Sequence, residues 1–244
     1  MKLLVLMGGK RLTDFENGYP LYLTEINNNL ILQIIISHYT KINFNQTIFC
    51  IKKEDIESFN VDSIIQSEIP ESKIVRINGE TAGAICTALL ASQYIDNNEE
   101  LLIVSIDDYI DYDINTIIAK FRNNNADVGI VSFNSVHPRY SFAKLDDNNN
   151  VCEVTEKKPI SKNALASFYY FKQGCDFVNS AQNAIRKDNK IHNAFYISQA
   201  INEMILIQKK IYMQKIDNKN FHSFKTEIQL ANYINDIKNE KESI

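Results

Sequence analysis

Short apolar runs alternate with longer segments of helical periodicity along the first half of the chain. The runs at 3–7, 47–51, 73–77 and 101–105 have the length and largely apolar character of strands buried within a sheet. Between them lie segments such as 29–40, in which apolar residues recur every three or four positions. This alternation is typical of βαβ units. We therefore expect an α/β protein with a Rossmann-like three-layer αβα fold and a mostly parallel central sheet.

After residue 134 the pattern changes to short strands separated by polar turns, and helical segments then return. The run of Asp and Asn at 146–150 indicates a hairpin loop. Since no Pro- or Gly-rich linker divides the chain, we expect a single domain, 1–244, made of two lobes, 1–134 and 135–244. The remaining elements expected from the pattern are helices at 84–94, 114–121, 174–186, 197–207 and 227–238, and strands at 127–133, 140–144, 151–155, 166–171 and 210–214.

Composition excludes several classes of function. The 244 residues carry a formal net charge of −4, and a nucleic-acid-binding surface needs a basic face instead. No apolar stretch approaches the length of a membrane span, and the apolar start, 1–7, is too short for a signal peptide. The four Cys lack the spacing of a metal site. We expect a cytoplasmic protein with reduced thiols and no nucleic-acid partner.

Three polar features fall where strands are expected to end. They are the loop 8–11, the loop 79–83 and the pair Asp107–Asp108. In an open parallel sheet the ligand crevice lies at the carboxyl ends of the strands. Mg²⁺ prefers one or two carboxylates plus the phosphate oxygens of a substrate, so the Asp pair predicts a site for Mg²⁺ or Mn²⁺. The alternative is that both Asp residues cap the turn into the next helix.

Several stretches resemble bacterial nucleotidyltransferases that build activated sugars and similar head groups for capsules and lipopolysaccharide. The resemblance implies a glycosyltransferase-A-like variant of the Rossmann fold. It covers nearly the whole chain and is most specific in the middle. The stretches that carry it are ELLIVSIDDYID at 100–111, ETAGA at 80–84, HPRYSFAKL at 137–145, VTEKKPIS at 154–161, 164–171 and NAFYIS at 193–198 with Asn202–Glu203.

The resemblance implies roles for residues of the first lobe, which would bind the nucleotide. Backbone N–H groups of a Gly-rich loop would wrap the triphosphate while basic side chains neutralise the departing pyrophosphate. A second loop would approach the base, and the Asp pair would bind the metal. The residues in these positions are Met7, Gly8 and Gly9 with the cations Lys10 and Arg11, then Glu80, Thr81 and Gly83, then Asp107 with Asp108.

The second lobe would bind a phosphorylated acceptor. In the family, the Glu-Lys pair matched here by Glu156 and Lys157 contacts the acceptor phosphate and its attached group. Lys157 is suited to neutralise a phosphate as a point charge, and Glu156 to accept hydrogen bonds from hydroxyl or amide groups. Tyr196 would line the acceptor side; the alternative for an aromatic residue at the start of a helix is a place in the core. For Lys157 the alternative is a solvated position in a turn beside a hairpin.

Three departures from the family pattern lie on the triphosphate side. The Gly-rich loop is shorter by about two residues, and Lys10 is an addition to it. The family's Pro-Lys pair appears as Pro20–Leu21, which removes a cation. Near the C-terminus the family's Gly-Thr turn appears as Lys225–Thr226, and the carboxylate that precedes it falls at Ser223 or Phe224.

The resemblance therefore implies a Mg²⁺-dependent nucleotidyltransferase of the pyrophosphorylase type. It would transfer a nucleoside monophosphate from an NTP to a sugar phosphate or similar head group, and the product would be a precursor of surface polysaccharide. Two alternatives remain open: a catalytically impaired protein that binds a nucleotide or its conjugate, and a glycosyltransferase of the same fold. The base, the acceptor and the oligomeric state are left open as well, including assembly into a homo-oligomer.

Overall fold

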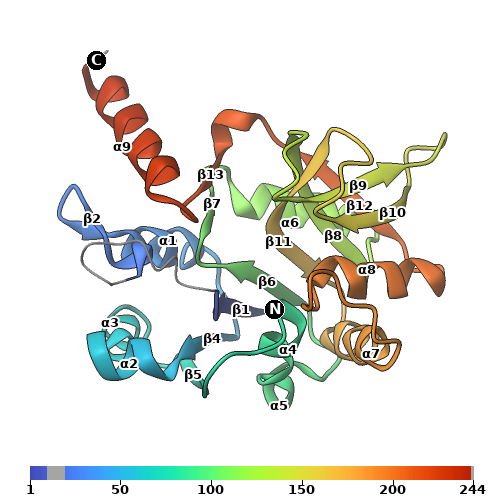
Figure 1. The fold of residues 1–244 in the computed structure, drawn as a ribbon, viewed down its shortest axis with the longest axis horizontal. Coiled ribbons are helices and arrows are strands. Elements are labelled where there is room, and N and C mark those ends of the chain that lie inside the picture. Colours follow the sequence, from blue (N-terminus) through green and yellow to red (C-terminus); the bar gives the residue numbers. More distant parts are fainter. Residues whose placement is uncertain (10–19, 243–244) are drawn as a thin grey trace.

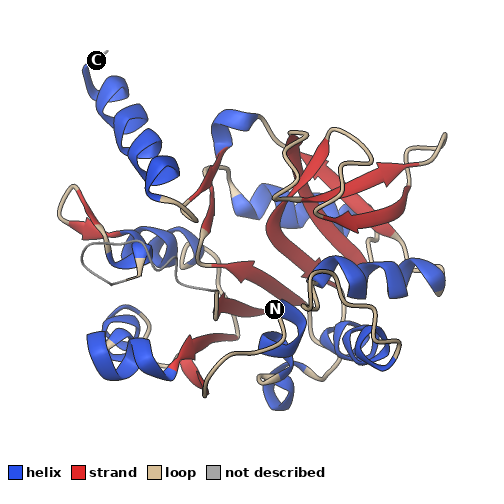
Figure 2. Ribbon diagram, viewed as in Figure 1, coloured by secondary structure: helices blue, strands red, loops and turns tan. Residues whose placement is uncertain are grey.

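A large mixed β-sheet forms the centre of the molecule, and helices cover both of its faces (Figures 1 and 2). The computed structural model describes residues 1–9 and 20–242. Within them the sheet follows the order β10-β9-β11-β6-β1-β4-β5, with β8 pairing β11 and β12. Its strands are β1 Lys2–Met7, β4 Gln46–Lys52, β5 Lys73–Ile77, β6 Leu101–Ser105, β8 Val128–Asn134, β9 Ser141–Leu145, β10 Val151–Glu156, β11 Asn163–Phe171 and β12 Ile211–Lys215.

The N-terminal part of the sheet is parallel. β1 lies between β6 and β4, so that Val5 is opposite Val104 on one side and Phe49 on the other. These three side chains are at most 2% exposed, as the apolar runs of the sequence predict for strands covered on both faces. Because the strands run the same way, β1 and β6 end at one edge of the sheet, which places Met7 and Ser105 near each other.

Antiparallel strands complete the sheet beyond β6. β11 runs antiparallel to β6, β8 and β9, whereas β12 returns parallel to β8. The pairing of β11 with β8 is irregular between Leu165 and Tyr169, and this stretch contains Ser167. The predicted α/β class with a large central sheet is confirmed, and its antiparallel part consists of the pairs of β11 with β6, β8 and β9 and of β10 with β9.

The helices pack on the two faces of the sheet in separate apolar clusters, which gives three layers. Among the described residues, none of the helices is both long and apolar enough to cross a bilayer. On one face lie α1 Ile31–Tyr39, α2 Lys53–Phe59, α3 Val61–Glu68 and α6 Ile114–Asn123, with the start of α9 Glu227–Glu242. On the other lie α4 Ala84–Leu89, α5 Ser92–Ile95, α7 Gly174–Arg186 and α8 Ile197–Leu206.

The single helix expected at 84–94 is wrong in one respect, because it is interrupted after α4. The N–H of Ala91 donates to the carbonyl of Ala88 at 3.0 Å, and that of Tyr94 donates to Ala91 at 2.9 Å. Such contacts, three residues apart, tighten the chain relative to an α-helix. Ala88, Ala91 and Ile95 are all at most 1% exposed, so the tightened turn keeps them in one core.

Small elements outside the main sheet also matter for the site. β7 Asp108–Ile110 pairs antiparallel with β13 Phe221–Ser223, which places Ser223 opposite Asp108. The sequence pattern predicts neither strand, because each has three residues. The other small elements are the 3-10 helices η1 Leu21–Leu23 and η2 Asn218–Asn220 and the strands β2 Glu25–Ile26 and β3 Asn29–Leu30.

Candidate functional site

The chain leaves β1 through two glycines that lie against the neighbouring elements. A Cβ on Gly8 would come within 2.9 Å of Ile77 Cδ1 and 3.2 Å of the Thr87 side chain. A Cβ on Gly9 would come within 3.1 Å of Asp107 Oδ2. Side chains at either position would crowd these groups. Gly8 therefore lets the backbone pass close to β5 and α4, and Gly9 lets it approach the acidic end of β6. The structure thus brings the predicted glycine loop and Asp107 together.

Other residues predicted around this loop have different positions. The Met7 side chain is 2% exposed and packs in the core, which leaves only its backbone for a ligand. Lys10 and Arg11, the two predicted cations of the loop, lie outside the described residues. Leu21 packs against the apolar core as part of η1, after Pro20.

The loop 79–83 packs against the backbone that precedes α8. The N–H of Phe195 donates to the carbonyl of Ala82 at 2.7 Å. Gly83 has a φ of 112°, and a Cβ on it would lie 2.4 Å from the carbonyl oxygen of Phe195. The Thr81 and Thr87 hydroxyls lie 2.7 Å apart. Since Thr87 also borders Gly8, this loop and the glycine loop share a neighbour.

Replacing Gly83 should test how closely this loop must approach α8. We expect Gly83→Ala to lower the free energy of unfolding by about 2–4 kcal/mol, through the clash with Phe195 and the left-handed backbone. Gly79 is the matched control, since its φ is 75° but a Cβ would have no atom within 4 Å. Gly79→Ala should cost about 1 kcal/mol. Equal losses in denaturant unfolding of the two variants would contradict this account.

Asp107 follows β6 and is partly buried. Its Oδ2 accepts a 3.4 Å hydrogen bond from the Ser105 hydroxyl, and its carbonyl accepts from the N–H of Phe224 at 2.7 Å. Burial raises the pKa of its carboxyl group to about 6; the charge of Asp108 adds to this rise, while that of Lys225 and the Ser105 hydroxyl oppose it. A cation placed beside this carboxylate would therefore stabilise its ionised form.

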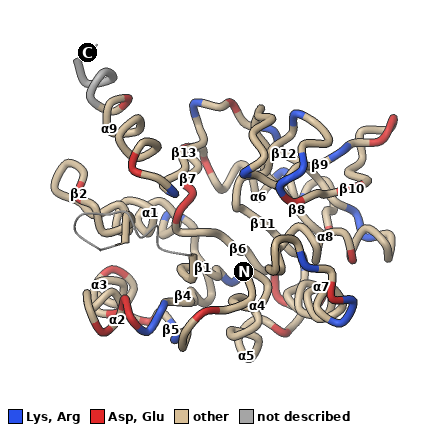
Figure 3. The backbone as a smooth tube through the Cα atoms, viewed as in Figure 1, with Lys and Arg blue, Asp and Glu red and all other residues tan. Residues whose placement is uncertain are grey.

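Asp108 begins β7 and is 4% exposed. Its Oδ2 accepts from the Ser167 hydroxyl at 2.5 Å and from Lys225 Nζ at 3.0 Å. Its Oδ1 is buried, and no hydrogen-bond partner for it occurs in the described part of the chain. The same holds for the hydroxyl of Ser223, the residue opposite it in β13. Basic and acidic segments adjoin here, at β7 and the base of α9 (Figure 3).

Lys225 is a residue of this site that the sequence pattern did not select. Its side chain is 41% exposed although it pairs with a buried carboxylate. Burial alone would lower its pKa, but the charges of Asp108 and Asp107 outweigh that effect and raise it. The available signal was a Lys in place of the family's Gly before Thr226. Ser167 had no signal, because a serine within an apolar strand is unremarkable in sequence.

Glu156 ends β10 and is 8% exposed. Its Oε2 accepts hydrogen bonds from the hydroxyls of Ser141 and Ser198. Burial raises the pKa of Glu156, and these two hydrogen bonds oppose that rise together with the charges of Lys157 and Lys225. Oε1 receives neither hydroxyl. The two hydrogen bonds thus fix the orientation of the carboxylate, and Oε1 can accept from a further donor.

Lys157 follows Glu156 in the left-handed region, with a φ of 55°. Its N–H donates to the carbonyl of Tyr140 at 3.0 Å. Its Nζ donates to the Tyr196 hydroxyl at 2.7 Å and lies 4.9 Å from the centroid of that ring. The structure therefore brings together Glu156, Lys157 and Tyr196, the three residues predicted for the acceptor.

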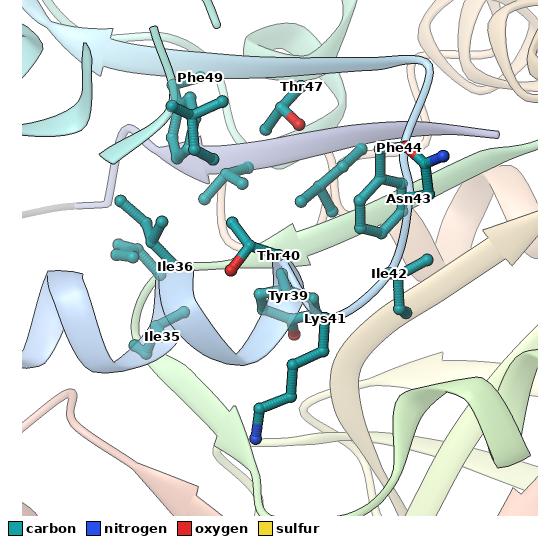
Figure 4. Close-up of a pocket in the computed structure, with 14 residues that line it drawn as sticks. Ile35, Ile36, Tyr39, Thr40, Lys41, Ile42, Asn43, Phe44, Thr47 and Phe49 are labelled. Carbon is teal, nitrogen blue, oxygen red and sulfur yellow. The ribbon is translucent and has the colours of Figure 1, made fainter. Parts of the chain in front are cut away.

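A separate cavity of about 360 Å³ lies between α1 and the sheet (Figure 4). Ile36, Ile42, Phe44 and Phe49 contribute to its largely apolar lining. Lys41, the one charged residue among the described lining residues, extends away from the other labelled side chains (Figure 4). The lining lacks the grouped charges that phosphate binding requires, so this cavity is distinct in chemistry from the site at Asp107.

Comparisons with known proteins identify the family and the fold of the chain. A family model described as nucleotidyl transferase matches residues 2–219. A nucleoside-diphosphate-sugar pyrophosphorylase from Vibrio cholerae RC9 superposes with a TM-score of 0.79 at 19% identity, covering 96% of this chain and all of that one. A UDP-glucose pyrophosphorylase complexed with UDP-glucose gives 0.76 at 12% identity and 98% of both chains.

No curated protein matches the chain. The two solved structures share less than a quarter of their residues with it, so they establish the fold. The family match establishes more than the fold, because it spans most of the chain. The matched residues include β1 and its glycines, Asp107 and the Glu156–Lys157 pair. The chain belongs to the nucleotidyl transferase family.

Proposed function

We propose that this protein transfers a nucleoside monophosphate from a nucleoside triphosphate to a phosphorylated small molecule. A phosphate oxygen of the acceptor attacks the α-phosphorus, the bond from that phosphorus to the bridging oxygen of the β-phosphate breaks, and pyrophosphate leaves. The reaction gathers negative oxygens around one phosphorus atom. Positioning and neutralisation of charge are therefore the main tasks of the protein.

The observation that carries this proposal is the close approach of Gly9 to the Asp107 carboxylate. A backbone without side chains can let a triphosphate lie against its N–H groups. A carboxylate next to that backbone can hold a cation between itself and the phosphate oxygens. The two features come from different strand ends, β1 and β6, and the parallel sheet brings them to one edge.

The residues at this edge fit a divalent cation held by one carboxylate. The Asp107 carboxyl group is partly exposed and has a raised pKa, so a bound Mg²⁺ would stabilise its ionised form. Asp108 fits less well, because its Oδ2 already accepts from Ser167 and Lys225. Among the described residues, no cluster of three or more His, Cys, Asp or Glu side chains could hold a metal ion. The proposed ligand set is thus Asp107 with phosphate oxygens; a bound Mg²⁺ would supply charge neutralisation and orientation of the triphosphate.

The acceptor side of the proposal rests on Glu156, Lys157 and Tyr196. Lys157, held by the Tyr196 hydroxyl, can neutralise the acceptor phosphate. Glu156 can accept a hydrogen bond from the group attached to that phosphate. We propose a sugar phosphate or similar head group as the acceptor and a precursor of surface polysaccharide as the product. The resemblance in the sequence supports both, and the sugar-nucleotide pyrophosphorylases with the same fold support the sugar phosphate as acceptor.

Release of pyrophosphate tests the proposed reaction. The purified protein is incubated with each of the common NTPs, Mg²⁺ and a panel of sugar 1-phosphates, phosphocholine and phospho-amino acids. We expect release with at least one pair, dependent on both the NTP and the acceptor. A panel without release in the presence of detectable NTP binding would favour a protein that binds without turnover.

That second candidate is supported by Leu21. The family pattern has a Lys here, whereas Leu21 packs against the apolar core and cannot neutralise a phosphate. Restoring the cation distinguishes the two functions. If the protein only binds nucleotides, Leu21→Lys should tighten NTP binding without producing turnover. If it is an active enzyme, the wild-type protein already releases pyrophosphate without this substitution.

A further inference from the structure

The Lys225 side chain interacts with carboxylates on both the nucleotide side and the acceptor side of the proposed site. Its Nζ is 3.0 Å from Asp108 Oδ2. Its positive charge also lowers the pKa of Asp107 and of Glu156, against the effect of their burial. One ammonium group thus acts on the proposed metal ligand and on the proposed acceptor-binding carboxylate at the same time.

The position of Lys225 is fixed by the backbone that precedes it. β13 pairs with β7, and directly after it the N–H of Phe224 donates to the carbonyl of Asp107 at 2.7 Å. Asp108, which receives the ammonium, is itself held by the Ser167 hydroxyl at 2.5 Å. The cation is therefore oriented by groups on two strands. A charge oriented in advance need not reorganise when a ligand binds.

The pair formed by Lys225 and Asp108 has one buried and one exposed partner. Asp108 is 4% exposed as a residue, whereas the Lys225 side chain is 41% exposed. A buried carboxylate strongly disfavours loss of its counter-ion. A half-exposed ammonium still has donors for an incoming anion, since it carries three N–H bonds. Lysine binds phosphate as a point charge, which needs only this access.

The structure assigns Lys225 as a phosphate-binding cation of the nucleotide site, with Asp108 as the residue that positions it rather than a ligand of the metal. This inference rests on the proposed function and deepens it. Leu21 leaves the site without one basic group of the family pattern, and Lys225 adds one next to Asp107. The site would then bind a polyphosphate even when no divalent cation is present, with Lys225 neutralising part of its charge.

Two binding measurements on the full chain test the assignment. Inorganic pyrophosphate is titrated calorimetrically in EDTA, and Mn²⁺ alone is titrated by electron paramagnetic resonance. Lys225→Met should weaken pyrophosphate binding about tenfold to a hundredfold, whereas Lys225→Arg should stay within about threefold of wild type. Mn²⁺ should bind Lys225→Met about tenfold more tightly, because Asp107 and Asp108 lose a competing cation.

A remote ion pair of similar length provides the control. Lys209 Nζ lies 2.7 Å from Asp176, and this pair links the segment between α8 and β12 to α7. Lys209→Met should change neither affinity. Should Lys225→Met fail to fold, Asp108→Asn is compared with the double variant Asp108→Asn/Lys225→Met, in which no charge is left unpaired. The double variant should bind pyrophosphate at least about tenfold more weakly than Asp108→Asn.

Some outcomes would overturn the assignment. One is that the wild-type protein binds no pyrophosphate in EDTA. Another is that Lys225→Met and Lys225→Arg both bind pyrophosphate with the affinity of the wild type. A fall in Mn²⁺ affinity in Lys225→Met would show that the Lys supports the metal site instead. Failure of the proposed function looks different: pyrophosphate binding would still depend on Lys225, but no NTP and acceptor pair would release pyrophosphate.

Discussion

Asp107→Asn should lower pyrophosphate release about a thousandfold while leaving the protein folded. The amide keeps the size of the side chain and its contact with Ser105 but removes the charge that would hold the cation. Since burial raises the pKa of Asp107 to about 6, the ionised carboxylate is unfavourable in the fold at pH 8. The Tm of the variant at pH 8 should therefore be no lower than that of the wild type.

The measurement compares kcat/KM with Tm in the same preparations. Asp176→Asn is the matched control, because Asp176 is also a partly buried carboxylate but lies on α7, where it pairs with Lys209. It should keep wild-type activity. If Asp107→Asn retained more than a tenth of the wild-type activity, Asp107 would not be the cation ligand. A large fall in Tm would instead show that the carboxylate supports the fold.

Much of the sheet could be predicted from the sequence, because the residues of each strand themselves show the pattern of a buried strand. β5 and β6 have the predicted bounds, 73–77 and 101–105, and α7 matches 174–186. Each is a run whose periodicity and burial agree with one element type. The break between α4 and α5 could not be predicted in the same way, since good helix formers continue across it. Tertiary burial of Ala91 decides it.

For the site as well, some positions could be predicted from the sequence and others could not. The Gly9 and Asp107 positions follow from their places at the ends of parallel strands, which a sequence pattern can locate. The contact of Lys225 with Asp108 does not, since the two residues are 117 positions apart and are joined through two strands of three residues. Even with Lys225 noted in place of a family Gly, its partner depends on the pairing of β7 with β13. Pairings this short leave no periodic signal.

The backbone of Lys157 also could not be predicted, and it bears on function. A φ of 55° is uncommon for a residue with a long side chain and costs about 1–2 kcal/mol. The hydrogen bond from its N–H to Tyr140 and the contact of its Nζ with Tyr196 hold this conformation. Strain of this kind is frequent at functional sites. It favours a role for Lys157 at the site over a solvated turn.

Lys157→Met should therefore lower kcat/KM for the acceptor about a hundredfold, because a charge-assisted contact to its phosphate is lost. The KM for the NTP should stay within about twofold, since Lys157 is proposed to contact only the acceptor phosphate. Steady-state kinetics with each substrate varied in turn separates the two. A matching rise in both KM values would place Lys157 on the triphosphate side instead.

Two further variants separate the charge of Lys157 from its surroundings. Lys158→Met removes the exposed neighbouring charge, and it should change neither KM. Tyr196→Phe keeps the ring 4.9 Å from the ammonium but removes the hydroxyl that accepts its hydrogen bond. It should cost about threefold to tenfold, as expected for one neutral acceptor of a charged donor. If Tyr196→Phe were as damaging as Lys157→Met, the hydroxyl itself would contact the acceptor, and the ammonium would serve to orient it.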